Sequence, residues 1–268
     1  MADDGISKIK IQSFTAVRGN DAAGMVQWIS RIERFPEAVR IRNRSYELLA
    51  VGPDDLVVDV GCGAGGAVDE LAERAGTAIG IDTSEQMIEV SRRRFPGRDF
   101  RCASAYELPF ADGAVSAYRA ERVFQHLERP ADALTEAYRV LAPGGRIVLL
   151  DQDYDSPTID ADDLALCRTI LRAQSDAIRQ RWIGRQYRGL LLDAGFVDVA
   201  VEVNTSVYTD YQKLGPMIPA IAAAAVEQGA VRQEQADAWL ADQHQRGEQD
   251  RFFATMPIFT AFARKPGT

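Results

Sequence analysis

The stretch LVVDVGCGAGG, residues 56–66, decides the fold class of this 268-residue chain. Its first five residues are an apolar run typical of a buried strand, a glycine-rich turn follows, and residues 68–74 have helical spacing. Glycines let the backbone come close to a ligand, and the first N–H groups of a helix point toward it. Strand, turn and helix together predict a corner that binds a nucleotide-like molecule.

Two cofactors fit this turn. Gly61, Gly63 and Gly66 satisfy the G-x-G-x-x-G spacing of a dinucleotide site. Asp59 precedes them, and its carboxylate favours a positively charged ligand such as S-adenosylmethionine, whereas it would repel the pyrophosphate of NAD. At the end of the next predicted strand, Asp82 is placed to accept both hydroxyls of a ribose.

The composition excludes several classes of protein. The net charge of −8 disfavours nucleic-acid backbones and anionic membranes. No apolar run approaches the ~20 residues of a membrane span, and the acidic start is unlike a secretion signal. Cys62, Cys102 and Cys167 lack metal-ligand spacing, and only two histidines are present. We therefore expect a cytoplasmic protein with reduced cysteines, no metal, no nucleic-acid partner and no membrane partner.

Strands and helices alternate from residue 56 onward, which predicts an α/β fold with a doubly wound parallel sheet. Strands are expected at 56–60, 77–81, 99–102, 114–119, 145–151, 197–203 and 258–264. Helices are expected at about 66–75, 84–94, 131–140 and 186–194.

Further helices are predicted outside this alternation. Residues 1–50 are expected to form an N-terminal helical cover, with Trp28, Ile29, Ile32 and Phe35 on one face and a second helix at about 38–50. Within the main domain, residues 51–268, helical insertions are expected at about 156–185 and 206–251. Both insertions follow strand ends, so we expect them to cover a substrate pocket. The alternative is that they pad the sheet or form the interface of a homodimer.

Five segments resemble one enzyme family in their order and spacing. They are Asp59 to Gly66, Asp82, Leu108-Pro109-Phe110, Glu121 to Leu127, and Leu141 to Gly145. Over about residues 45–205 the chain resembles class I S-adenosylmethionine-dependent methyltransferases, and most of all their type 11, or UbiE-like, small-molecule branch. The resemblance implies a seven-stranded Rossmann-like sheet whose last strand is antiparallel.

The resemblance also implies a function. It indicates S-adenosyl-L-methionine as cofactor and methyl transfer to an O, N or C atom of a small organic acceptor, such as a secondary metabolite. One alternative is a relative that binds S-adenosylmethionine but catalyses cyclisation or acts as a non-methylating module. A nicotinamide-dependent oxidoreductase is disfavoured by Asp59 and by the Leu-Ala-Pro-Gly-Gly joint at 141–145.

The family's cofactor contacts can be placed on this chain residue by residue. The glycines are expected to line the methionine part, Asp59 to reach its ammonium, and Asp82 to hold the ribose. Where the family has an acidic residue for the adenine, this chain has Ser104, which is a departure from the pattern. The full implied set is Asp59, Gly61, Gly63, Gly65, Asp82, Thr83, Met87, Ser104, Ala105, Ala120 and Glu121.

The candidate catalytic residues are His126, Asp153 and Tyr154. The family often has a histidine at the position of His126, and the ordinary pKa of histidine, near 6.5, suits a general base. The alternative is that His126 packs the local turn. Asp153 and Tyr154, with Asp151, follow the fifth long strand and would lie at the pocket edge, or else in a solvated loop.

Arginines and aromatic residues are further candidates. Arg119 and Arg122 could bind a carboxylate of the cofactor or acceptor, but ion pairs with Glu121, Asp151 or Asp153 are the simpler expectation. The aromatic residues of the cover segments would suit a planar substrate, or would only pack; they are Phe14, Trp28, Tyr208 and Tyr211.

Overall fold

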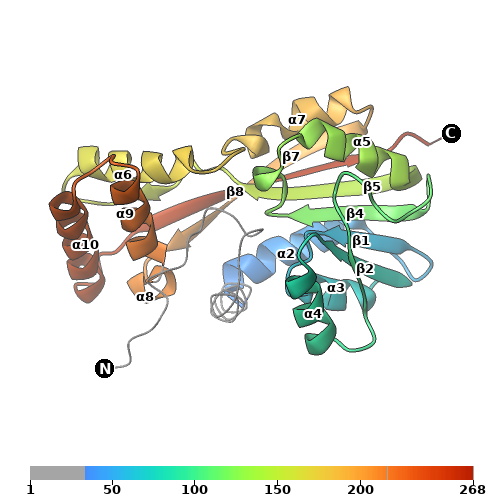
Figure 1. Ribbon diagram of the computed structural model, residues 1–268, viewed down its shortest axis with the longest axis horizontal. Helices are drawn as coiled ribbons and strands as arrows, with labels where there is room; N and C mark the ends of the chain where they lie inside the picture. Colours follow the sequence, from blue (N-terminus) through green and yellow to red (C-terminus); the bar gives the residue numbers. More distant parts are fainter. Residues whose placement is uncertain (1–33, 216, 268) are drawn as a thin grey trace.

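A computed structural model describes residues 34–215 and 217–267 of the chain (Figure 1). Its sheet has eight strands in the order β3-β2-β1-β4-β5-β8-β6, and β7 also pairs with β8. The strands are β1 (Leu56–Val60), β2 (Thr77–Asp82), β3 (Asp99–Cys102), β4 (Val115–Glu121), β5 (Leu141–Gln152), β6 (Thr158–Ile159), β7 (Val197–Tyr208) and β8 (Ala254–Arg264).

The strand directions confirm the predicted fold class. Strands β1 to β5 are parallel where they pair, and β8 runs antiparallel to β5 and β7. All seven predicted strands are present. The two-residue β6, too short to give a sequence signal, pairs with the start of β8 and makes the sheet eight-stranded rather than seven-stranded.

Helices cover both faces of the sheet. They are α2 (Pro36–Leu49), α3 (Gly66–Ala72), α4 (Glu85–Arg94), α5 (Pro130–Val140) and α7 (Ile183–Asp193). Along β1, Val57 packs with α2 and α3, whereas Val58 faces the cluster that contains residues of α5 and α7. Because both faces are buried, the parallel strands are continuous apolar runs rather than alternating ones.

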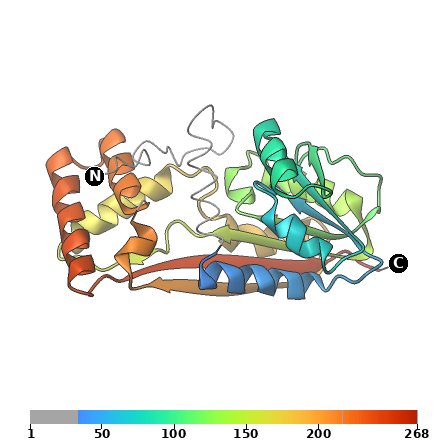
Figure 2. The same cartoon turned by 90° about the horizontal axis from the view of Figure 1, so that it is seen from below.

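A second group of helices forms a separate lobe. We call α6 (Leu164–Asp176), α8 (Tyr211–Leu214), α9 (Met217–Glu227) and α10 (Gln233–Glu248) the helical lobe. These helices pack on one another around Ile170, Ile221 and Trp239. Strands β7 and β8 extend beyond the parallel strands to reach the lobe (Figures 1 and 2). Most of residues 156–185 and 206–251 thus lies in helices, and β6 within the first of these segments joins the sheet.

The predicted helix at 38–50 is present as α2, and it packs on the sheet. Ile41, Tyr46 and Leu49 of α2 belong to the cluster that contains Val148 and Leu150 of β5. Helix α2 therefore belongs to the helical layer on one face of the sheet. The predicted positions Phe14, Trp28, Ile29 and Ile32 lie outside the described residues.

Within residues 34–215 and 217–267, no helix has the length and apolar character needed to cross a bilayer.

Candidate active site

A cavity of about 1270 Å³ lies at the carboxyl ends of β1, β2, β4 and β5. One wall is the glycine turn after β1 together with the first residues after β2. The opposite wall includes Leu214 and Met217 of the helical lobe, with Tyr208 and Met256 of the strands that reach it. The cavity is therefore at the strand edge where open α/β sheets bind ligands.

The glycine turn is shaped by three glycines with positive φ. Gly61, Gly63 and Gly65 have φ of 71°, 51° and 85°. A side chain at Gly61 would overlap Val123, and one at Gly65 would lie 2.8 Å from both Phe100 and Ser91. At Gly63, by contrast, the nearest atom to an added Cβ is 4.0 Å away, on Met87. Packing thus requires Gly61 and Gly65, whereas Gly63 leaves open space beside the cavity that a ligand can occupy.

Asp82 connects the end of β2 to this turn. Its Oδ2 accepts a hydrogen bond from the Gly63 N–H at 3.0 Å, and its Oδ1 accepts one from the Ser84 N–H at 2.9 Å. Burial raises the pKa of Asp82, and these backbone bonds oppose the rise. Each carboxylate oxygen has a second lone pair, so Asp82, which lines the cavity, can still accept the hydroxyls of a ribose.

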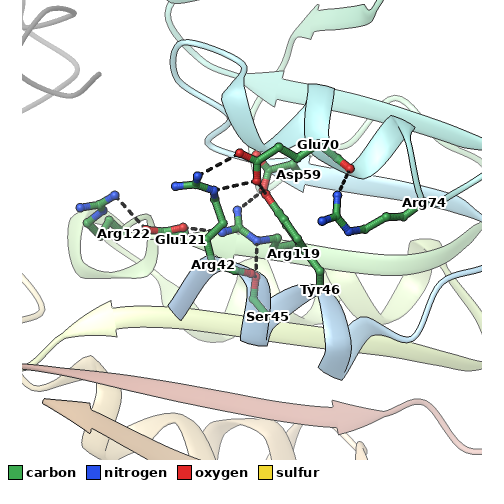
Figure 3. Close-up of polar contacts among 9 residues, drawn as sticks. All are labelled: Arg42, Ser45, Tyr46, Asp59, Glu70, Arg74, Arg119, Glu121 and Arg122. Atoms are coloured by element: carbon green, nitrogen blue, oxygen red, sulfur yellow. Dashed lines mark hydrogen bonds and ion pairs between the residues drawn. The ribbon is translucent and has the colours of Figure 1, made fainter. Parts of the chain in front are cut away.

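A buried ion-pair network joins β1 and β4, and its members Asp59, Arg119 and Glu121 line the cavity (Figure 3). Arg119 of β4 is 1% exposed and donates to Asp59 at 2.7 Å, to Ser45 at 2.9 Å and to Glu121. Arg122 pairs with the other oxygen of Glu121 at 2.8 Å. The predicted ion pairs of Arg119 and Arg122 with Glu121 are confirmed, and the pair between Arg119 and Asp59 was not expected.

The pKa values of Asp59 and Glu121, the two carboxyl groups of this network, shift in opposite directions. Burial raises the pKa of Asp59, and Arg119 opposes that rise. Burial also acts on Glu121, but Arg122 and Arg119 together lower its pKa to about 2. Glu121 is ionised at neutral pH because it has two cationic neighbours.

Helix α2 extends the network to the helix that follows the glycine turn. Arg42 donates two hydrogen bonds of 2.9 Å to Glu70 of α3, and the Tyr46 hydroxyl donates a third of 2.9 Å. Arg42 and Glu70 both line the cavity. These residues were not among those predicted from the sequence. The available signal was the polar set Arg42, Ser45 and Tyr46, spaced to share one face of a helix.

Four further residues of the expected cofactor set lie along the cavity. Thr83, Met87, Ser104 and Ala105 all line it. The Ser104 hydroxyl accepts a hydrogen bond from the Tyr106 N–H at 3.2 Å, and it can still donate one hydrogen bond and accept another. Two residues of the expected cofactor set, Gly65 and Ala120, do not line the cavity. Ala120 is buried.

His126 lies in a short 3₁₀ turn, Phe124–His126, at the cavity wall. Its Nε2 is 3.0 Å from Nε2 of Gln125, and burial lowers its pKa. The turn is anchored from below, since the Gln125 N–H donates to Asp151 at 3.4 Å and the Tyr187 hydroxyl donates to the other oxygen of Asp151. His126 therefore lines the cavity and is neutral at pH 7, and a general base needs both properties.

Asp153 does not reach the cavity. It is fully buried, pairs with Arg185, and accepts hydrogen bonds from the Asp155 N–H at 3.0 Å and the Ser156 hydroxyl at 2.9 Å. These contacts occupy its carboxylate, so we do not retain Asp153 among the candidate bases. Tyr154 lines the cavity, and burial raises the pKa of its hydroxyl to about 12.

Asp151 yields a prediction about stability. Burial raises its pKa from 3.8 to about 7. Between these two pH values the folded protein binds a proton that the unfolded chain does not. The stabilisation that this proton binding gives the fold is complete below pH 3.8 and is lost as the pH rises through 7. Asparagine resembles the protonated side chain. We expect the free energy of unfolding of Asp151→Asn, relative to wild type, to increase between about pH 5 and pH 8 in urea titrations. A difference independent of pH would contradict this prediction.

Several lining residues had no motif to reveal them. Six glutamines line the cavity: Gln86, Gln125, Gln152, Gln174, Gln180 and Gln186. Tyr208 lines it as well, whereas Tyr211 packs edge-on against Phe252 within the helical lobe. In the part of the chain that the structure describes, no three His, Cys, Asp or Glu residues are grouped to hold a metal ion.

Comparison with known proteins finds similar sequences over the part of the chain that contains the glycine turn. Residues 58–149 match the family described as methyltransferase domain. The chain is 39% identical over 194 residues to an uncharacterised 37.1 kDa protein in transposon Tn4556 of Streptomyces fradiae, covering 70% of this chain and 56% of that protein. It is 35% identical over 129 residues to demethylmenaquinone methyltransferase of Thermus thermophilus, covering 46% and 59%. The chain thus spans less than two thirds of either relative.

A solved structure supports the same fold. A candidate methyltransferase from Bacillus halodurans superposes with a TM-score of 0.60 at 18% identity, covering 84% of this chain and 98% of that one. The sheet order, the glycine turn and the sequence matches are all similar to those of class I S-adenosylmethionine-dependent methyltransferase domains. The sequence match to the methyltransferase-domain family is confined to residues 58–149, which include the end of β1, the glycine turn and most of β5.

Proposed function

We propose that this protein transfers the methyl group of S-adenosylmethionine to an O, N or C atom of a small organic acceptor. The observation that supports the proposal is a single cavity with two different walls. The sheet side has the glycine turn and Asp82, and the helical lobe contributes apolar Leu214 and Met217 together with polar Gln174 and Asp176.

The glycine turn fits the cofactor. The open space at Gly63 and the remaining lone pairs of Asp82 suit an adenosine, and the carboxyl groups of Asp59 and Glu121 suit an ammonium. When bound, the cofactor supplies a methyl group on a sulfonium, which leaves as a neutral thioether. The chain's own residues then have three tasks, which are to align the acceptor, exclude water and, where required, remove a proton.

The candidate acceptor end of the cavity indicates an uncharged molecule. Met217, Met256 and Ile258 offer adaptable apolar contacts. The charged residues of the neighbouring segment are paired, Arg181 with Asp176 and Arg179 with Glu128 at 4.0 Å. Apolar contacts, neutral glutamines and internally paired charges together favour an uncharged acceptor.

Gln125 indicates that the acceptor has a hydrogen-bond donor. The residue is 1% exposed, and its Oε1 has no hydrogen-bond partner within residues 34–215 and 217–267. An unsatisfied buried oxygen costs roughly 1–3 kcal/mol, which a hydrogen bond from a ligand would recover. We therefore infer that the acceptor has a hydroxyl or amine donor near Gln125 and His126.

A product-detection assay tests the proposal. We expect S-adenosylhomocysteine to form with uncharged, apolar acceptors bearing a hydroxyl or amine, and not with matched acceptors bearing a carboxylate or phosphate. Turnover restricted to the charged members would contradict the acceptor class. If S-adenosylmethionine binds but a converted substrate shows only cyclisation and no S-adenosylhomocysteine, the methyl-transfer proposal is wrong.

The remaining expectations concern the protein's surroundings. A cytoplasmic location, a homodimer, and the absence of nucleic-acid partners stay predictions. Sedimentation at several protein concentrations would measure the oligomeric state.

A further inference from the structure

Arg119 is unusual for its position in the fold. It lies on β4, directly opposite Asp59 of β1 in the parallel register, in the middle of the sheet. Its neighbours on that face include Val57, Ala117 and Val148, which belong to an apolar cluster. Burying a guanidinium costs several kcal/mol unless it is well paired, and an apolar residue of similar size often stabilises a fold as well as a buried ion pair does. Stability alone therefore gives little reason for an arginine here.

All three donor nitrogens of Arg119 are used. Nη1 donates to Oδ1 of Asp59, Nη2 to Oε2 of Glu121, and Nε to the hydroxyl of Ser45 on α2. Ser45 is fully buried and donates in turn to the Arg42 carbonyl at 2.6 Å. The guanidinium is thus fixed from three different elements (Figure 3).

These contacts leave one carboxylate oxygen for a ligand. Oε1 of Glu121 is paired with Arg122, whereas Oδ2 of Asp59 accepts no hydrogen bond from the part of the chain that is described. Asp59, Glu121 and Arg119 all line the cavity next to the glycine turn. Without the guanidinium, the two neighbouring carboxylates would repel each other, and one of them would take up a proton.

We propose that Arg119, held by Ser45 of α2, is a positioning residue for the amino-acid end of the cofactor. It keeps Asp59 and Glu121 charged and separated, and it directs the unpaired oxygen of Asp59 to the cofactor's ammonium. Helix α2 thereby becomes part of the cofactor site. The inference rests on the proposed function, because it assumes that S-adenosylmethionine binds in this cavity.

Two ligands separate this role from a merely structural one. S-adenosylhomocysteine has the amino-acid end, and 5′-methylthioadenosine lacks it while keeping the adenosine and the thioether. For Arg119→Met, we expect the Kd of S-adenosylhomocysteine in calorimetry to rise about 10- to 100-fold, as for a lost charge-assisted contact. The Kd of 5′-methylthioadenosine should stay within about threefold, since that ligand has no ammonium to position.

Two milder variants keep the test decisive if Arg119→Met does not fold. Arg119→Lys retains the charge but has one nitrogen for three acceptors, so its loss of S-adenosylhomocysteine affinity should be smaller. Ser45→Ala removes only the contact to α2 and should act in the same direction, again without affecting 5′-methylthioadenosine. Arg264→Met, at an exposed arginine paired with Asp198 at 2.8 Å, is the matched control and should change neither Kd.

The outcomes also separate this inference from the proposed function. Equal weakening of both ligands, or unchanged affinity for S-adenosylhomocysteine in all three variants, would overturn the role of Arg119. If the wild-type protein binds neither ligand, the proposed function itself fails.

Discussion

Gly63→Val is expected to abolish cofactor binding while leaving the fold intact. Gly63 has a φ of 51°, and an added Cβ would extend into open space beside Met87, where we place the cofactor. A branched side chain there would occupy the ligand's volume. We expect the Kd for S-adenosylhomocysteine to rise at least about 100-fold, equivalent to roughly 2.8 kcal/mol. Isothermal titration calorimetry measures this change directly.

A second glycine controls for backbone strain. Valine at a positive φ costs roughly 1–3 kcal/mol wherever it occurs, so Gly63→Val will also lower the melting temperature. Gly97 has a φ of 94°, has open space around an added Cβ, and does not line the cavity. Gly97→Val should therefore lose comparable stability and keep full affinity. If both variants lose affinity equally, strain rather than occupied volume is responsible, and the placement of the cofactor at Gly63 is wrong.

The glycine turn could be predicted from sequence because its causes are local. The backbone geometry of Gly61 and Gly63 needs glycine wherever the turn occurs, and Asp82 contacts the turn through a backbone N–H. The apolar runs of the parallel strands similarly reflect burial on both faces. Such features depend on residues close in sequence, or on a periodicity, and both are visible in a single chain.

The ion-pair network could not be predicted in the same way. Ser45, Asp59 and Arg119 come from three separate elements, and nothing in the sequence indicates that α2 packs beside β4. The same reason explains why Asp153 was wrongly placed at the pocket edge, because its partner Arg185 lies on α7. Charged residues after a strand have no periodicity, so their partners are known only once the helices are placed.

His126→Ala is expected to lower kcat about 10²- to 10⁴-fold, the usual contribution of a general base. His126 lines the cavity in a turn that Asp151 anchors, and it adjoins Gln125, to which we assign the acceptor's donor group. The affinity for S-adenosylhomocysteine should not change, because the histidine acts on the acceptor. Single-turnover rates with an acceptor from the product-detection assay would measure the effect.

The pH dependence distinguishes a base from a packing residue. A base must be unprotonated, and burial lowers the pKa of His126, so wild-type turnover should fall only below pH 6.5, and His126→Ala should lack that step. His244 is the matched control, since it is exposed on α10 and lies 3.5 Å from Glu248. Its alanine variant should keep the wild-type rate and pH profile. Full turnover in His126→Ala would mean that the acceptor's nucleophile needs no base, and that alignment by the cavity suffices for the reaction.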